Sequence, residues 1–459
     1  MPQIVPKPAS ADQLEALAKA LVASGLEPIR QPEDLKRLSQ DRHDFSPLLT
    51  PLLSGCRAQL AVRVTSVDQV RQVAAACFQA KVPLTVRGAG SGNYGQCVPL
   101  VGGLVVDLGG LRLLRQLEAD SQALWGEAGA LLADIDAELL PRGRALRLAP
   151  STWRSATVGG FIAGGSGGIG SLRWGFLRDP GNLLGLEVVT IEAEPRLLRL
   201  DAQASEPLNH AYGCNGIVTA LRLPSCEAVA WQQLVVGFSA WDQSLAAAQA
   251  LPTTALQLNS LCLLEAPIAA RSPWPAGCPG AEAGEHRLLV LAAPDTLEVL
   301  PGWLARRGGE LRWQAPQGQS RGLPLRELTW NHTTLHWRAH SPDWTYLQLL
   351  LPQPEGPALA SLRARWGKDL LWHLEAVRHQ GAARLACLPL LRWRGEADLR
   401  ALLDHCGSLG AQVFNPHVLT VEDGGLGVVD GDQVAAKAAY DPAGLLNPGK
   451  LRGWLERQG

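Results

Sequence analysis

The sequence of 459 residues lacks an excess of either charge and lacks any long apolar run. Its 42 Lys and Arg residues are balanced by 43 Asp and Glu residues, so no basic surplus exists to neutralise a phosphate backbone. No apolar run approaches the ~18–20 residues of a membrane span, and residues 1–13 lack the charged and apolar regions of a secretory signal. These absences argue against nucleic acid as a partner and against a membrane span, and they predict a cytoplasmic protein.

Cysteine is present, but it is never paired as C-x-x-C. An odd number of scattered cysteines indicates neither a disulfide framework nor a Cys-ligated cluster, so we predict reduced and mostly buried thiols and no metal site. The nine positions are Cys56, Cys77, Cys97, Cys214, Cys226, Cys262, Cys278, Cys387 and Cys406.

Glycine, with 48 residues, is the one strong excess, and it concentrates in two segments. The first follows a β-α-β pattern: strands are predicted at 60–64 and 82–86, with a helix capped by Ser66 between them. It contains Gly90-Ser91-Gly92-Asn93-Tyr94-Gly95 and leads to a third strand at 104–108. The second segment covers 156–175 and precedes a strand at 186–191. Glycines bounded so tightly by strands indicate positive φ or close approach to a ligand.

Two phosphate-binding motifs occur in the sequence, but each lacks a neighbouring feature that its usual mode of phosphate binding requires. The G-x-G-x-x-G at 90–95 would indicate a Rossmann site only if a helix followed, but the sequence runs into another strand. The G-x-x-x-x-G-K at 444–450 is followed by Leu451, where a P-loop needs Ser or Thr. What remains is a glycine loop whose backbone N–H groups can cradle an anion such as a diphosphate. Two such segments together imply a long ligand.

Several ordered motifs resemble the FAD-binding oxidoreductases of the vanillyl-alcohol-oxidase type, also called PCMH-type, and within them the members similar to glycolate oxidase and D-lactate dehydrogenase. The matching stretches are VPLTVRGAGSG at 82–92, APS at 149–151, TVGG at 157–160, GIGSLRWG at 168–175, Asp179, LGLEVV at 184–189, YGCNGIVT at 212–219 and GLLNPGK at 444–450. The resemblance implies FAD as cofactor and an α+β, two-domain fold with an antiparallel-sheet cap over the flavin.

The resemblance also implies roles for residues. The first loop would wrap the pyrophosphate, the second segment would line the ribityl and flavin side, and backbone near 216–218 would meet the adenine. The implied FAD-binding residues are Arg87, Gly88, Ala89, Gly90, Ser91, Gly92, Asn93, Pro150, Ser151, Thr157, Val158, Gly159, Gly160, Gly164, Gly167, Gly170, Ser171, Gly216, Ile217, Val218, Asn447 and Lys450. Trp174 is the one tryptophan that we place near the flavin.

Two departures from the family matter. Covalent members often carry a His in the first loop, where Ser91, Gly92 and Asn93 stand here, so non-covalent FAD is implied. The His-x-Gly-Asp-Gly-Asn-x-His metal motif of related 2-hydroxy-acid dehydrogenases is absent, and the nearest stretch is FNPH at 414–417. Metal-assisted chemistry is therefore not predicted.

Four units are expected along the chain: an N-terminal helical lead-in at 1–50, the FAD domain at 51–226, a cap or substrate domain at 227–430 and a C-terminal return at 431–459. The lead-in contains a helical pattern at 14–22. In the cap, helical patterns at 357–378 and 396–407 and strands near 384–390 and 411–421 favour an antiparallel sheet with helices on one face.

The candidate catalytic residues come from the cap. The β-branched and aromatic run at 327–337 favours a strand, which would put His332, His336, Arg338 and His340 on one face; as a helix, the three histidines would still align. A flavin dehydrogenase needs a base for the substrate hydroxyl and a cation for an acid. We predict His332, His336 and Arg338 in these roles, with His417 as a second base, and a solvated edge strand or a metal site as the alternatives.

The leading functional hypothesis is an FAD-dependent oxidation of an alcohol, a small 2-hydroxy acid such as glycolate or lactate, by hydride transfer to flavin N5. The reduced flavin would pass its electrons to a quinone, a protein or oxygen. An alternative is an FAD-binding, non-catalytic subunit of a larger oxidase complex, with a partner subunit. A third, an NADPH-dependent enolpyruvyl-nucleotide type of reductase, is disfavoured by the motifs at 168–189 and 441–450.

Overall fold

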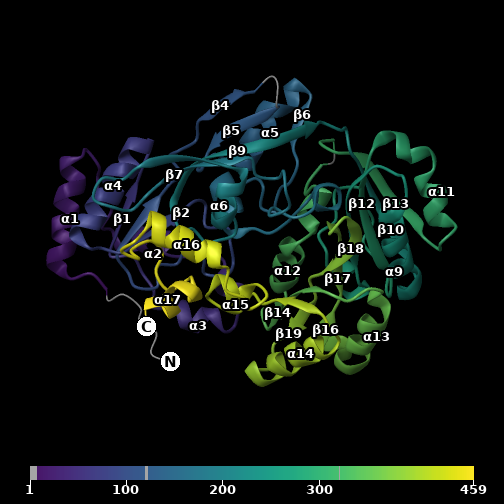
Figure 1. Ribbon diagram of the computed structural model, residues 1–459. Helices are drawn as coiled ribbons and strands as arrows, with labels where there is room; N and C mark the ends of the chain where they lie inside the picture. The colour runs from purple at the N-terminus through teal and green to yellow at the C-terminus, as the bar shows by residue number, and fades with distance from the viewer. Residues whose placement is uncertain (1–7, 119–121, 320, 459) are drawn as a thin grey trace.

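The computed structural model describes residues 8–118, 122–319 and 321–458 (Figure 1). The first seven residues of the predicted lead-in lie outside this range. The elements up to residue 227 are α1 (Ala11–Ala23), α2 (Pro32–Leu38), α3 (Leu49–Leu53), β1 (Leu60–Arg63), α4 (Val67–Ala80), β2 (Leu84–Arg87), β3 (Leu104–Asp107), β4 (Leu114–Leu117), β5 (Ala123–Glu127), α5 (Leu132–Leu139), β6 (Arg144–Leu146), α6 (Val158–Gly164), α7 (Ser171–Trp174), β7 (Gly185–Val189), β8 (Leu197–Asp201), α8 (Ala202–Ser205) and β9 (Ile217–Glu227).

These elements build two sheets. The small one is parallel, in the order β1-β3-β2, and the larger is antiparallel, in the order β4-β5-β9-β7-β8 with β6 also paired to β9. Ser66 caps α4 as predicted, since its Oγ accepts a hydrogen bond from Gln69 N at 3.2 Å. The three predicted strands appear as β1, β2 and β3, and β7 starts one residue earlier than predicted. Buried side chains of α1, α4 and both sheets form one continuous core.

The remaining elements are β10 (Gln232–Phe238), α9 (Trp241–Ala250), β11 (Leu258–Leu264), α10 (Ala266–Ala269), β12 (His286–Ala292), α11 (Leu300–Ala305), β13 (Glu310–Pro316), α12 (Asn331–Arg338), β14 (Trp344–Tyr346), β15 (Gln348–Leu350), α13 (Glu355–Trp366), β16 (Leu370–Leu371), β17 (His373–His379), β18 (Ala382–Cys387), β19 (Leu390–Arg392), α14 (Glu396–Ser408), β20 (Gln412–Phe414), α15 (Val421–Gly424), α16 (Gly431–Tyr440) and α17 (Arg452–Gln458). They form an eight-stranded antiparallel sheet, β13-β10-β12-β11-β17-β18-β15-β20, and a smaller one, β14-β19-β16.

The inner strands β10, β12 and β11 of the eight-stranded sheet are buried on both faces, whereas its edge strand β13 is not. Along β11, Leu261 and Leu263 enter the core shared with α9, α13 and α14, whereas Cys262 and Leu264 enter the core shared with α12. Figure 1 shows α12 between this sheet and the sheets of the first half. The predicted α+β class with an antiparallel sheet in the second half is confirmed; the four predicted domain boundaries stay predictions.

Two element predictions in the second half were wrong. The helical pattern at 357–378 stops at Trp366, where α13 ends, and residues 373–379 are strand β17 because β11 and β18 pair with it on either side. The run at 327–337 contains no strand: it holds helix α12, which starts after Trp330. Strand-like composition was overridden by a tertiary contact at the start of this helix, described below.

The C-terminal segment returns to the first half (Figure 1), where α16 packs against residues 206–208. Leu84 N donates to Leu445 O at 2.9 Å, and Asn447 N donates to Leu84 O at 2.7 Å, so the tail adds a bridge to the edge of β2. Among the described residues, no helix has the length and apolar character needed to cross a bilayer.

Candidate functional site

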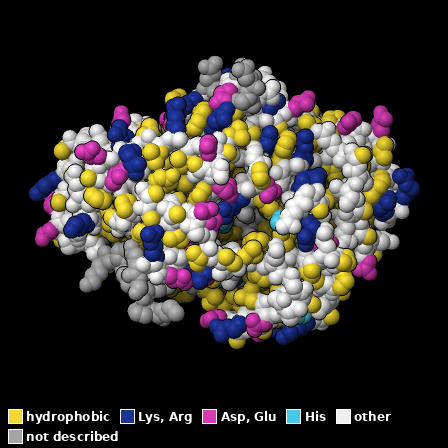
Figure 2. Space-filling model, viewed as in Figure 1, with side chains coloured by type: hydrophobic (Ala, Val, Ile, Leu, Met, Phe, Trp, Pro, Cys, Tyr) yellow, Lys and Arg dark blue, Asp and Glu magenta, His cyan; other side chains and the backbone are white. Residues whose placement is uncertain are grey.

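A cavity of about 460 Å³ lies between the first half of the chain and α12. Figure 2 shows the molecule hollowed at its centre. Three kinds of wall meet there: the glycine loop after β2, the second glycine segment around α6, and the start of α12 with β15. None of the described residues that line the cavity is Asp or Glu, whereas Arg42 and Arg87 are among them. The cavity therefore suits an anionic ligand.

The first wall is the loop that leaves β2. No helix lies between β2 and β3, which confirms that the G-x-G-x-x-G is not a Rossmann turn. Within the described chain, the backbone N–H groups of residues 88–95 donate no hydrogen bond to another protein group. Gly90 has φ +70°, a conformation that favours glycine. A row of unused donors around such a turn is what binding of a diphosphate requires.

Contacts from three directions fix this loop. Arg87 Nη1 donates to Leu38 O at 3.3 Å, and Nη2 donates to Ala89 O at 3.1 Å. From the tail, Asn447 Nδ2 donates to Gln96 O at 2.9 Å, and Lys450 Nζ donates to Gly95 O at 2.6 Å. Burial lowers the pKa of Lys450 to about 8. The tail residues therefore hold the loop from behind and do not line the cavity.

The second wall is built on α6. Thr157 caps this helix, since its Oγ1 accepts a hydrogen bond from Gly160 N at 3.2 Å. Gly88 packs against that hydroxyl so closely that a Cβ on Gly88 would lie 2.1 Å from Thr157 Oγ1. Gln96 Nε2 donates to Gly164 O at 2.9 Å and so joins the two glycine segments. The two walls are thus a single unit, as expected for one extended ligand.

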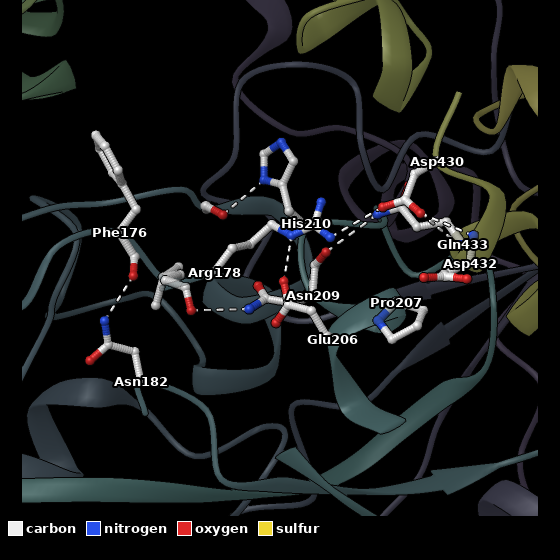
Figure 3. A network of polar contacts seen from close by, with 12 residues as sticks. Phe176, Arg178, Asn182, Glu206, Pro207, Asn209, His210, Asp430, Asp432 and Gln433 are labelled. Atoms are coloured by element: carbon white, nitrogen blue, oxygen red, sulfur yellow. Dashed lines mark hydrogen bonds and ion pairs between the residues drawn. The ribbon is translucent and has the colours of Figure 1, made fainter. Parts of the chain in front are cut away.

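A polar network behind the second wall ties it to the C-terminal helix α16 (Figure 3). His210 Nδ1 is 2.8 Å from Gly165 O, and Asn209 Nδ2 donates to Leu177 O at 3.1 Å. Burial lowers the pKa of His210. Arg178 bridges Glu206 at 2.6 Å and Asp430 at 3.1 Å. Residues far apart in the sequence thus support the carbonyl of Gly165, which lies in the cavity wall.

The third wall comes from the cap side. Trp330, Asn331, His332 and Leu335 line the cavity from the start of α12. Burial, with the neighbouring His336 as a smaller cause, lowers the pKa of His332 to about 4, and its Nδ1 is buried without a hydrogen-bond partner. Gln348 Nε2 donates to Tyr94 Oη at 2.6 Å, and Asn93 Nδ2 donates to Tyr346 Oη at 2.7 Å. These bonds fasten the glycine loop to the cap.

Most of the predicted FAD residues line this cavity. They are Arg87, Gly88, Ala89, Gly90, Ser91, Gly92, Asn93, Pro150, Ser151, Thr157, Gly159, Gly160, Gly164, Gly167, Gly216 and Val218. Six others lie outside it: Val158, Gly170, Ser171, Ile217, Asn447 and Lys450. Trp174 also lies outside, where Arg147 and Arg173 stack on its ring at 4.4 and 5.2 Å.

Of the four candidate catalytic residues, the structure brings only His332 into the cavity wall. His336 Nε2 is 3.0 Å from Glu327 O, and its ring lies 6.0 Å from that of His332. Arg338 Nη2 donates to Asp44 O at 2.8 Å. His417 is buried between Ser46 and Tyr346. Burial lowers the pKa of all three groups, to about 4 for His417.

Sequence reasoning missed several lining residues. Tyr94 and Gln96 adjoin the glycine loop, and Asn331 adjoins His332, so neighbourhood in the sequence was a usable signal for them. Arg42, Phe45 and Gln348 also line the cavity, but no motif surrounds them. Only the tertiary structure brings these three residues to the cavity.

Comparisons with known proteins agree with this geometry. Residues 58–200 match the FAD binding domain family, of the PCMH type. This part of the chain is therefore similar to an FAD-binding domain. The predicted resemblance and the FAD cofactor are thereby confirmed. The glycine loop after β2, the cap of α6 and β7 all fall within the matched residues.

Curated relatives match about a third of this chain. Glycolate oxidase subunit GlcD of Bacillus subtilis is 28% identical over 159 residues, which cover 34% of this chain and 33% of that protein. D-lactate dehydrogenase of Anaerostipes hadrus is 27% identical over 136 residues, 30% of this chain and 28% of that protein. The match thus spans a third or less of these relatives' length.

A solved structure extends the likeness to the whole fold. An alkyldihydroxyacetonephosphate synthase superposes with a TM-score of 0.74 at 12% identity, covering 98% of this chain and 86% of that one. At this identity the likeness shows the fold alone, and it confirms the predicted fold: a PCMH-type FAD-binding fold with a cap.

Proposed function

We propose that this protein is an FAD-dependent oxidoreductase that oxidises an alcohol, most specifically a small 2-hydroxy acid such as glycolate or lactate, with FAD held non-covalently. The observation that carries the proposal is His332: a neutral imidazole with an unpartnered, buried Nδ1 lies in the wall of the cavity that the FAD-binding domain also lines. The names of the relatives, glycolate oxidase and D-lactate dehydrogenase, support this substrate class.

Different residues of the chain are proposed to bind the cofactor and to accept the substrate's proton. The unused N–H groups of 88–95 and the glycines of the second wall hold FAD, which when bound supplies the hydride acceptor, N5. His332 is the proposed acceptor of the substrate's hydroxyl proton; with a pKa of about 4, its imidazole is neutral at physiological pH.

A carboxylate on the substrate needs a cation, and Arg42 is the candidate. The guanidinium of Arg87 donates hydrogen bonds to backbone carbonyls. The Arg42 side chain is more than half exposed, and within the described part of the chain its one ion pair is with Asp44, at 3.3 Å. A quinone, a protein or oxygen is the proposed electron acceptor. His417, His336 and Arg338 are proposed as supports of the cap.

The decisive test is the visible absorption spectrum of the FAD-loaded protein under anaerobic conditions, before and after addition of 2-hydroxy acids. We expect one of them to bleach the flavin. His332→Gln should keep the FAD content and slow bleaching at least a hundredfold, a usual loss when a general base is removed. His340→Gln is the matched control, because His340 lies exposed in the turn after α12.

Each other outcome has a definite meaning. A flavin spectrum that no 2-hydroxy acid or other alcohol bleaches would favour a non-catalytic, FAD-binding subunit that works with a partner. A protein that stays colourless after incubation with FAD would refute both readings. Equal bleaching rates in His332→Gln and in the unaltered protein would remove His332 from the chemistry while leaving the substrate class intact.

A further inference from the structure

Helix α12 begins in a costly backbone conformation. Trp330, the residue before the helix, has φ 54° and ψ −142°, a region that a residue with a side chain rarely adopts. Trp330 and the two residues after it line the cavity. The unusual backbone therefore turns three consecutive side chains, His332 among them, toward the ligand. Something outside the helix must hold this turn.

The holding group is a buried carboxylate from the neighbouring sheet. Glu375 Oε1, on β17, accepts a hydrogen bond from Trp330 N at 2.7 Å. The same oxygen lies 2.7 Å from His373 Nε2. Glu375 is 1% exposed and His373 is fully buried, so water does not compete for either bond. His373 Nε2 also lies 3.4 Å from the Oγ1 of Thr333, a residue in the first turn of α12.

Cys262 completes the cluster, opposite Glu375 in the pairing of β11 with β17. Thiol, imidazole and carboxylate atoms lie within 4.8 Å of one another, a set that resembles zinc ligands. The distances fit hydrogen bonding instead. Two ligands about 2.1 Å from a tetrahedral zinc lie about 3.4 Å apart, whereas His373 Nε2 and Glu375 Oε1 are 2.7 Å apart. Burial, followed by the nearby Glu375, raises the pKa of Cys262, so its thiol stays protonated.

We propose that Glu375, oriented by His373, is a positioning residue that holds the turn 330–332 in the cavity wall and so places His332. The carboxylate acts by where its oxygen lies rather than by its charge, because its partner at the turn is a backbone N–H. The predicted effect on turnover rests on the proposed function. The predicted effect on the backbone turn at 330–332 does not depend on it.

The test compares three substitutions in the FAD-loaded full chain. Glu375→Gln keeps a carbonyl oxygen at the same reach, which can accept from both Trp330 N and His373 Nε2, so it should hold the turn. Glu375→Asp keeps the charge but draws the oxygen back by about one C–C bond, and Glu375→Ala removes it. Glu265→Gln is the control: Glu265 is another buried carboxylate beside β11, and its Oε2 accepts a hydrogen bond from Trp372 N at 2.8 Å, away from α12.

Two readouts separate positioning from general stability. Hydrogen–deuterium exchange of peptides covering 330–338 should rise at least tenfold in Glu375→Ala and less in Glu375→Asp, with exchange in β17 and β11 unchanged. Glu375→Gln and Glu265→Gln should match the unaltered protein. With a substrate, kcat should fall at least tenfold in Glu375→Ala with KM within twofold, because Arg42 and the glycine walls are untouched.

If Glu375→Ala does not fold, the exchange rates at 330–338 in Glu375→Asp and Glu375→Gln test the proposal. Exchange at 330–338 that rises with Gln but not with Asp would overturn the proposal in favour of a charge effect. Stoichiometric zinc in the purified protein, lost in Cys262→Ala, would overturn it in favour of a metal site. If no hydroxy acid reduces the unaltered protein, the proposed function fails, and the exchange pattern still decides whether Glu375 holds the turn.

Discussion

His417 Nδ1 accepts a hydrogen bond from Ser46 Oγ at 2.8 Å, across 371 residues of sequence. The other ring nitrogen, Nε2, donates to Tyr346 O at 3.0 Å. Tyr346 O can only accept, so Nε2 carries the ring proton. Ser46 Oγ accepts from Leu49 N at 3.1 Å and can donate its own proton to Nδ1, so a neutral ring satisfies all of these contacts. The imidazole thus joins the N-terminal region, the cap and the segment leading to the tail.

We expect this histidine to make stability pH-dependent. Burial lowers the pKa of His417 from 6.5 to about 4 in the folded chain. Between these values the unfolded chain binds more protons, so the free energy of unfolding falls as the pH drops from about 6.5 to 4, by up to about 3 kcal/mol. His417→Gln should flatten urea-unfolding stability between pH 7 and pH 5. Parallel curves for the variant and the unaltered protein would contradict this.

Gly88→Ala should weaken FAD binding at least tenfold. The added Cβ would lie 2.1 Å from Thr157 Oγ1, which is itself committed to the cap of α6, so the two glycine walls must move apart. A fluorescence titration with FAD measures the effect. Gly356→Ala is the matched control, since a Cβ on Gly356 meets nothing within 4 Å and its φ is not positive; that variant should bind FAD normally.

Asn447→Ala should loosen FAD without unfolding the chain. The side chain donates to Gln96 O at 2.9 Å and to Tyr212 O at 2.7 Å, and both acceptors belong to residues that line the cavity. Losing two hydrogen bonds of about 1 kcal/mol each predicts a rise in the Kd for FAD of up to about thirtyfold. Asn447→Asp should be worse, because a carboxylate cannot donate to two carbonyls. An unchanged Kd in both variants would show that the tail does not support the loop.

Lys437→Met should cost about 3–5 kcal/mol of unfolding free energy, because it leaves Asp441 buried without its cation. Lys437 Nζ lies 2.5 Å from Asp441 Oδ2 and also donates to Cys214 O and Leu446 O, and both side chains are almost fully buried. Arg178→Gln, which breaks the half-exposed ion pairs of Figure 3, should cost no more than about 1 kcal/mol. Urea unfolding of the two variants compares them; equal losses would contradict the burial argument.

The cofactor side of the site could be predicted because its signal is local. A glycine loop between two strands, the Thr157 cap and the returning tail each leave their pattern in a short stretch, and most of the residues inferred from the resemblance line the cavity. Asn447 and Lys450 were inferred in the same way; they lie behind the loop, and their side chains donate to its backbone carbonyls. Their sequence pattern gave no sign of which side of the loop they occupy.

The cap side could be predicted only in part, because its decisive contacts join distant segments. The β-branched composition of 327–337 favoured a strand. In the structure, Glu375 accepts a hydrogen bond from Trp330 N, and helix α12 begins at the next residue. With α12 formed, His332 lies in the cavity wall, whereas His336 and Arg338 bond to backbone carbonyls elsewhere. His417 comes from a different segment and bonds to Tyr346 O.

By itself, then, the sequence determined that the chain builds a glycine-lined anion site between strands and an α+β fold with an antiparallel cap, because turn chemistry and strand alternation are properties of neighbouring residues. The tertiary structure alone decided which imidazole faces the ligand and that Arg42 and Gln348 join it. Those outcomes depend on pairings such as Glu375 with Trp330 and Ser46 with His417, made by groups 45 and 371 residues apart in the sequence. Burial excludes water from both pairings, and it lowers the pKa of His417.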